Sequence, residues 1–193
     1  QHTHTHTHKS HRYAFRIRSC ARSLSFGERS YQHDILLGTF ARTFTIETAT
    51  REFLRCCSKT KCQIINLGAG CSTLFWRLKK DGTIDSSKVS FYEVDLKDTA
   101  LAKRRIIQSR EELSSLTKEG YVLVSADLRD MSGVQKCLEE QSLKSDIPTL
   151  LISECTLMYL PPKSSSAVIS WASTFFSSRL AFITYEPFRP EDK

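Results

Sequence analysis

From about residue 60 to residue 185 the sequence alternates short apolar runs with longer amphipathic stretches. The apolar runs have the length and composition of buried strands, and they cover residues 62–67, 88–94, 121–126, 149–154 and 180–185. Helical patterns precede the first run and separate the others, at residues 46–57, 71–80, 96–116, 131–142 and 163–177. Strict alternation of this kind predicts an α/β fold with a doubly wound, mostly parallel sheet and right-handed crossovers.

Functional side chains are expected at one edge of such a sheet, because ligands bind at the carboxyl ends of parallel strands. Four consecutive strand candidates end in a glycine turn or in a carboxylate. These residues are Gly68, Ala69 and Gly70 after the first strand, Glu93 and Asp95 at the end of the second, Asp127 after the third and Glu154 at the end of the fourth. Together they form the candidate ligand site.

The glycine turn after the first strand indicates a nucleotide-type ligand, although by itself it is a weak signal. Gly68 and Gly70 allow a sharp backbone turn and a close approach to a ligand. The dinucleotide fingerprint G-x-G-x-x-G is incomplete, because Thr73 stands at the third glycine position. The motif therefore favours a ligand that lacks a pyrophosphate.

The carboxylates suggest which ligand the turn would hold. Asp95 lies 25 residues beyond Gly70, where a carboxylate can accept hydrogen bonds from ribose hydroxyls. Asp127 could accept the adenine amino group while Leu128 packs on the ring, and Glu154 adds a negative charge at the pocket centre. With no Arg or Lys beside the glycine turn, the site would repel the phosphates of NAD and ATP and attract a cationic sulfonium. The expected cofactor is S-adenosylmethionine.

Each of these assignments has a structural alternative. Asp95 could cap the helix that follows it, and Asp127 could cap the next turn; either role explains these residues as well as ligand binding does. Glu154 has no such simple alternative, because an acid that ends an apolar strand costs several kcal/mol if it is buried without a partner. Phe75 and Trp76 are expected in the core.

Length and composition indicate a single domain of ordinary size. The 193 residues are 40% hydrophobic, which suffices for a core, and contain no apolar stretch long enough to span a membrane. The seven cysteines are odd in number and lack CxxC spacing, which favours reduced thiols in the cytoplasm over a disulfide framework or a metal site. Of the net charge of +7, +6 lies in residues 1–60, so a basic face for nucleic acid is not expected.

Residues 1–37 are set apart by composition. The opening QHTHTHTHKSH alternates His and Thr without an initiator Met, and the residues after it are rich in Arg and Ser. We interpret the segment as a low-complexity, basic leader that is disordered or non-native. Two other interpretations stay open, since the His residues could bind a metal and the composition is also that of a transit peptide.

Six segments resemble the leucine carboxyl methyltransferase family and occur in the family's order. They are GTFARTFTIETATREFL (38–54), CQIINLGAGCSTLFWRL (62–78), FYEVDL (91–96), SADLRD (125–130), PTLLISECTLMYLPP (148–162) and FITYEP (182–187). The resemblance covers about residues 38–188 and implies the Rossmann-like fold of class I S-adenosylmethionine-dependent methyltransferases. It also implies the family's reaction, which is methylation of the C-terminal leucine carboxylate of the protein phosphatase 2A catalytic subunit.

The resemblance further implies roles for residues that match the family's motifs. The assignments are Arg42 to the cofactor carboxylate, Gly68 to its methionine portion, Asp95 to the ribose, Asp127 and Leu128 to the adenine, Glu154 to the methionine ammonium and Tyr159 to the substrate carboxylate. Two alternatives remain, a related tRNA-modifying methyltransferase of the wybutosine pathway and a catalytically silent cofactor-binding fragment. We expect a monomer, with the phosphatase tail as partner and no nucleic-acid or membrane partner.

The chain departs from the family pattern at both ends. Residues 1–37 show no clear counterpart of the segment before the family's YFAR motif, and after FITYEP the family continues with two more strands and a helical lid. We therefore expect a methyltransferase domain over residues 38–193 that is truncated after the fifth strand. Such a fragment is expected to be poorly stable and inactive alone, because its fifth strand would be an exposed apolar edge.

Overall fold

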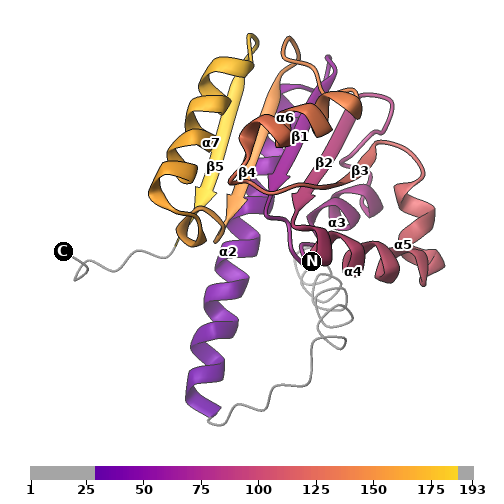
Figure 1. The fold of residues 1–193 in the computed structure, drawn as a ribbon. Helices are drawn as coiled ribbons and strands as arrows, with labels where there is room; N and C mark the ends of the chain where they lie inside the picture. The colour runs from indigo at the N-terminus through magenta and orange to yellow at the C-terminus, as the bar shows by residue number, and fades with distance from the viewer. Residues whose placement is uncertain (1–28, 187–193) are drawn as a thin grey trace.

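Five parallel strands form one sheet at the centre of the molecule (Figure 1). The structure, a computed structural model, describes residues 29–186, with side chains from residue 38 onward. The sheet order is β3-β2-β1-β4-β5. The strands are β1 (Cys62–Leu67), β2 (Val89–Asp95), β3 (Tyr121–Ser125), β4 (Thr149–Glu154) and β5 (Leu180–Tyr185). This confirms the predicted α/β fold, and the strand bounds agree with the predicted ones to within one residue.

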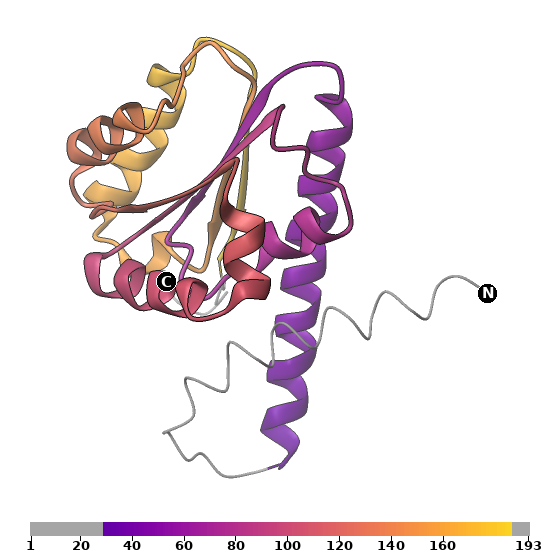
Figure 2. The same cartoon turned by 90° about the vertical axis from the view of Figure 1, so that its right-hand side faces the viewer.

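Helices cover both faces of the sheet. They are α2 (Arg29–Cys56), α3 (Leu74–Lys80), α4 (Lys97–Gln108), α5 (Glu111–Ser114), α6 (Met131–Glu140) and α7 (Pro162–Phe175), with two short 3₁₀ turns, η1 (Ser115–Thr117) and η2 (Leu157–Tyr159). Figure 2 shows the sheet between α6 and α7 on one side and α2 on the other. In Figure 1, α2 continues past the carboxyl ends of the strands.

The apolar residues of each strand alternate between these two faces, because side chains along a strand point to opposite sides with a period of two. Ile64 of β1 belongs to the cluster that packs against α2, α3, α4 and α5, and Ile65 belongs to the cluster that packs against α6 and α7. Phe75 and Trp76 are buried in the first cluster, as predicted. A sheet covered on both faces requires near-continuous apolar strands, which is the pattern the sequence shows.

Three helix predictions differ from the structure by three residues or more at a bound. The stretch 96–116 is not one helix, since α4 ends at Gln108 and Arg110, in an extended conformation, starts α5. The helix after β1 begins at Leu74 instead of residue 71, because the residues before it form a turn in which the Ser72 amide donates to the Ala69 carbonyl (2.8 Å).

The helix before β1 is the largest correction. It begins at Arg29 and not near residue 46, so it has 28 residues and crosses the expected domain boundary at residue 38. The part of the helix before residue 46 gave no clear apolar periodicity, and Phe40 and Phe44 in it are 43% and 61% exposed. Residues 1–28, which include the alternating His and Thr, lie outside the described residues.

No helix within residues 29–186 is long and apolar enough to cross a membrane.

Candidate functional site

The glycine turn lies at the point where the strand order reverses. β1 pairs with β2 on one side and with β4 on the other. In the two registers Leu67 is opposite Val94 and Ser153, so the strands end together. The turn that follows β1 is therefore flanked by Asp95 from β2 and by Glu154 from β4. This is the topological switch point at which open α/β sheets bind their ligands.

The glycines of the turn have backbone conformations that favour glycine. Gly68 has φ of +64° and Gly70 has φ of +47°, both in the left-handed region. A Cβ at Gly68 would overlap the Thr156 side chain, whereas a Cβ at Gly70 would meet no atom within 4 Å. Thr156 in turn donates to the Leu67 carbonyl (3.2 Å). The turn is thus packed tightly against the loop that follows β4.

A pocket of about 330 Å³ opens at this turn. Its walls come from α2, the ends of β1 and β4, and the residues from the glycine turn to the first turns of α3. The lining residues are Thr39, Arg42, Thr43, Ile46, Asn66, Gly68, Ala69, Gly70, Cys71, Ser72, Thr73, Leu74, Arg77 and Glu154. The predicted residues Arg42, Gly68, Ala69, Gly70 and Glu154 are therefore brought together.

Asp95 connects the end of β2 to the glycine turn. Its Oδ2 accepts a hydrogen bond from the Gly70 amide (2.6 Å), and its Oδ1 accepts from the Leu96 amide (2.8 Å). Leu96 is the residue that precedes α4, and α4 has no side-chain cap. The helix-cap alternative for Asp95 is therefore wrong, and its carboxylate lies at the expected position beside the turn.

Arg42 and Glu154 form an ion pair in the lining of the pocket. Arg42 Nε lies 2.5 Å from Glu154 Oε1, and both side chains are partly exposed. Arg42 Nη1 also donates to Cys155 Sγ at 3.3 Å. The contact through Nε is an ion pair and not an aligned hydrogen bond, so this buried nitrogen has no hydrogen-bond partner among the described residues. Glu154, which is costly to bury alone, thus has a cationic partner that spacing did not reveal.

Asp127 and Leu128 are not brought to this pocket. Asp127 accepts hydrogen bonds from the Arg129 side chain (2.9 Å from Nε to Oδ2) and from the Arg129 amide (2.9 Å). The hydrogen bond from the Arg129 side chain holds the pKa of this partly exposed carboxyl below its usual range. Leu128 is buried in the cluster under α6. The alternative that Asp127 caps the turn leading to residue 131 is confirmed, because its carboxylate accepts from the Arg129 amide and its carbonyl accepts from the Asp130 amide (2.9 Å). Helix α6 itself is capped by Asp130, which accepts from the Gly133 amide (3.0 Å).

Tyr159 lies in η2, five residues after Glu154, with 77% of its surface exposed. Its backbone amide donates to the Thr156 carbonyl (3.1 Å). The ring is not part of the pocket lining, and it is available to a molecule that approaches the carboxyl edge from outside.

The expectation that no Arg or Lys lies beside the glycine turn was wrong. Lys103 Nζ, from α4, donates to the Ser72 carbonyl (3.0 Å), and Arg77 of α3 lines the pocket. Both cations are paired with carboxylates, Lys103 with Glu93 (2.6 Å) and Arg77 with Glu47 (2.6 Å). Helix packing brings them to the turn, which linear spacing could not show. Charge repulsion alone therefore does not exclude a phosphate ligand.

Glu93 is fully buried on the α4 side of the sheet. Its Oε2 accepts from Tyr121 Oη (2.5 Å) as well as from Lys103. Burial raises the pKa of the Glu93 carboxyl, and the charge of Lys103 only partly opposes that effect. Glu93 therefore supports the loop through Lys103 and does not reach the pocket, although the sequence placed it at the same strand end as Asp95.

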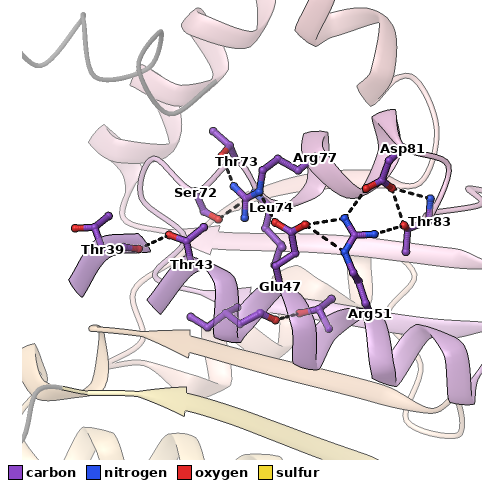
Figure 3. A network of polar contacts seen from close by, with 12 residues as sticks. Thr39, Thr43, Glu47, Arg51, Ser72, Thr73, Leu74, Arg77, Asp81 and Thr83 are labelled. Carbon is purple, nitrogen blue, oxygen red and sulfur yellow. Dashed lines mark hydrogen bonds and ion pairs between the residues drawn. The ribbon is translucent and has the colours of Figure 1, made fainter. Parts of the chain in front are cut away.

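A network of charged side chains attaches α2 to the turn. Figure 3 shows Glu47 between the guanidinium groups of Arg51 and Arg77. Arg51 also contacts Asp81, at the end of α3. Burial opposes the ionisation of Glu47, but the hydrogen bonds and charges of both arginines outweigh it, so its pKa lies below the ordinary value. The network fixes the helix that carries Arg42, and the i, i+4 spacing of Glu47 and Arg51 was the only sequence signal for it.

Other lining residues were not among the predicted site residues, and four of them are polar or charged side chains of β1, α2 and α3. Asn66 is a buried polar residue in the otherwise apolar strand β1, and that contrast is a signal that the sequence did offer. The sequence offers no such signal for Thr39, Thr43 and Arg77, because polar residues at these spacings are ordinary in helices. Among the described residues no three His, Cys, Asp or Glu side chains are grouped to hold a metal.

The model of the family described as leucine carboxyl methyltransferase matches residues 6–173 of the chain. The match begins inside the segment 1–37 that composition set apart as a leader, so the similarity extends further toward the N-terminus than residue 38.

Curated proteins of two names are similar to the chain. Leucine carboxyl methyltransferase 1 of Rattus norvegicus is 33% identical over 177 residues, covering 83% of this chain and 52% of that protein. tRNA wybutosine-synthesizing protein 4 of Homo sapiens is 32% identical over 174 residues, covering 80% of this chain and 25% of that protein. The chain therefore spans about half the length of the first of these relatives and a quarter of the second.

Solved structures share the fold. Magnesium protoporphyrin IX methyltransferase from Synechocystis PCC 6803, a structure with bound S-adenosylmethionine, aligns with a TM-score of 0.52 and 16% identity over 92% of this chain and 74% of that one. A plantazolicin methyltransferase in complex with S-adenosylhomocysteine aligns with a TM-score of 0.50 and 12% identity over 80% of this chain and 51% of that one. The fold is that of class I S-adenosylmethionine-dependent methyltransferases.

Proposed function

The chain belongs to the leucine carboxyl methyltransferase family, and on that premise we propose that it binds S-adenosylmethionine at the glycine turn and methylates a C-terminal leucine carboxylate. The proposed acceptor is the tail of the protein phosphatase 2A catalytic subunit. Bound there, the cofactor supplies an electrophilic methyl group on a sulfonium. All other steps depend on how this chain holds the two reactants.

The observation that carries the proposal is the pair of opposite charges in the pocket lining. Arg42 and Glu154 contact each other, and both line the space beside the glycine turn. An amino-acid group has one carboxylate and one ammonium, so a ligand of that kind could pair with both side chains at once. The exchange replaces one ion pair by two. A dinucleotide, with no free ammonium and carboxylate, offers no such match.

Asp95 supports the adenosine part of the proposal. Its carboxylate is fixed by the Gly70 and Leu96 amides, and each oxygen keeps a lone pair for a ribose hydroxyl. We assign the ribose to Asp95 and the methionine portion to the backbone of Gly68, Ala69 and Gly70.

For the adenine we propose Asp127 and Leu128, at the end of the next strand along the edge. Asp127 forms an ion pair with Arg129, and Leu128 belongs to the apolar cluster on the α6 side of the sheet, so both residues also have structural partners.

The chemistry needs no general base. A leucine carboxylate is ionised at neutral pH, so it can attack a sulfonium methyl group directly. The protein has to align the carboxylate with the methyl group, which favours reaction through proximity and orientation. It also has to exclude water from the site. We assign Tyr159 to positioning the acceptor carboxylate, because its exposed ring lies in the turn that follows Glu154.

Calorimetric titration with S-adenosylhomocysteine tests the cofactor assignment. We expect saturable binding by the folded chain, none of comparable affinity with NAD, and loss of binding in Asp95→Ala. Arg42→Met should weaken binding of S-adenosylhomocysteine more than binding of 5′-methylthioadenosine, which lacks the amino-acid group. Equal weakening of both ligands would remove Arg42 from its assigned role, and failure of the folded wild-type chain to bind would refute the cofactor assignment.

A second function, tRNA methylation, is favoured by the 32% identity to the human wybutosine-synthesizing protein. The acceptors distinguish the two. Transfer of labelled methyl to a peptide that ends in leucine, and not to the same peptide with an amidated C-terminus, supports carboxyl methylation. Transfer to tRNA alone supports the alternative, and cofactor binding without transfer to either supports a catalytically silent module.

A further inference from the structure

The turn that follows β4 contacts the site at several points. Cys155 accepts from Arg42, Thr156 packs against Gly68, and Tyr159 is exposed at the rim. Cys155 has φ of +50°, which is left-handed and unusual for a residue with a side chain. Such a conformation persists only where surrounding contacts hold it. The question is which contacts do so.

The carboxylate of Glu186 is the acceptor for this turn. Glu186 directly follows β5. The Cys155 amide donates to the Tyr185 carbonyl (2.8 Å), so the carboxyl ends of β4 and β5 lie side by side. Oε1 accepts from the amides of Thr156 (3.3 Å) and Leu157 (3.1 Å), and Oε2 accepts from the amide of Met158 (3.3 Å).

Two hydroxyl groups complete the surroundings of the same carboxylate. Ser153 Oγ donates to Oε1 at 3.2 Å, and Thr184 Oγ1 lies 3.4 Å from the same oxygen. Three successive backbone amides directed at one anion satisfy the donors at the start of η2, and hydrogen bonds to an ionised acceptor are stronger than those between neutral groups. No side chain within the turn itself caps η2.

We propose that Glu186 is a positioning residue that fixes the turn of residues 155–159 against the glycine turn. It acts through Thr156, which contacts Gly68, and through Cys155, which accepts a hydrogen bond from Arg42. Glu186 does not line the pocket itself. The consequence for methyl transfer rests on the proposed function. The position of the turn does not depend on the proposed function, because it follows from hydrogen bonds within this chain.

Hydrogen exchange of the backbone amides tests the positioning role directly. In the full 193-residue chain, Glu186→Ala should accelerate exchange at Thr156, Leu157 and Met158 by about tenfold or more, since each loses a bond to a charged acceptor. Glu186→Gln keeps one acceptor oxygen and should show a smaller acceleration. Thr184→Val is the matched control, because it removes a donor to the same carboxylate and leaves the turn amides bonded.

The exchange of β5 separates a local effect from loss of the strand. The amides of residues 181–184 should stay protected in Glu186→Ala. Unchanged exchange at residues 156–158 would overturn the proposal, and so would equal acceleration in β5, since Glu186 would then hold the strand and not the turn.

Binding of S-adenosylhomocysteine links the turn to the pocket. The Kd should rise about tenfold in Glu186→Ala, less in Glu186→Gln, and stay unchanged in Thr184→Val. Accelerated exchange with an unchanged Kd would overturn the claim that the turn positions the pocket. If the folded wild-type chain fails to bind, the proposed function fails, and the exchange measurements still decide the role of Glu186.

Discussion

Gly68 and Gly70 share a left-handed backbone but differ in their surroundings, which gives a matched pair of substitutions. Gly70→Ala meets open space and should cost only the backbone strain, about 1–2 kcal/mol. Gly68→Ala adds an overlap with Thr156 and should cost about 1–3 kcal/mol more. Urea unfolding of the two variants measures the difference, and equal destabilisation would show that the packing on Thr156 is loose.

Glu47 gives a prediction for the pH dependence of stability. Its pKa in the folded protein lies below the ordinary value of 4.5, so the unfolded chain takes up a proton first as the pH falls. The stabilisation by Glu47 is therefore complete well above pH 4.5 and is lost as the pH falls through the folded pKa. We expect Glu47→Gln to lower the urea midpoint more at about pH 6 than at about pH 3.

An equal decrease at both pH values would contradict this account of Glu47. Glu93 is useful for comparison, because its pKa is raised by burial. It retains its proton to higher pH in the folded state than in the unfolded state, so its contribution has the opposite sign and weakens stability as the pH rises.

Site residues at the ends of the strands next to β1 could be predicted from the sequence, and residues placed by more distant elements could not. Asp95 and Glu154 end the two strands that flank β1, so their position at strand ends was sufficient. Asp127 follows β3, which is two strands away from β1, and the sequence does not reveal that distance. Arg42 was indicated only by the family resemblance, because one Arg within a helix forms no pattern.

Among the elements, helix α2 depends on its contact with α3. Arg77 is 11% exposed and bonds both Glu47 and Thr73, so Arg77→Met should destabilise the fold by about 2 kcal/mol and weaken binding at the pocket. Arg55→Met, on α2, removes an exposed ion pair with Glu52 and should have no measurable effect. Thermal unfolding and calorimetry of both variants test this, and equal behaviour would contradict the role of Arg77.

The helices were less predictable than the strands for a physical reason. All five strands are sandwiched between helices, so their apolar runs are continuous and bounded. Among the described side chains of α2, Phe40 and Phe44 stay exposed, so the apolar positions of this part of the helix do not form a stripe that faces the core. The break near Arg110 depends on one extended residue, which the period of the surrounding apolar positions does not reveal.

At the scale of the whole molecule, β5 lies at an edge of the sheet and has a strand partner on one side only among the described residues. An apolar edge of this kind favours self-association, and a charged residue on it opposes pairing. We expect the wild-type chain to associate as its concentration rises and Thr184→Lys to associate less. Ser125→Lys, on the opposite edge at β3, is the control for light scattering; an equal effect of both would show that β5 is not responsible.

Arg42 forms an ion pair with Glu154 and a hydrogen bond to the Cys155 thiol, and these contacts bear on the order of folding. Arg42 and Cys155 are 113 positions apart in the chain, and β4 must have paired with β1 before they can meet. Closing so long a loop is entropically costly, and such contacts form late. We therefore expect the sheet to mature before the pocket does, so a refolding chain regains its circular dichroism before it regains the ability to bind a ligand.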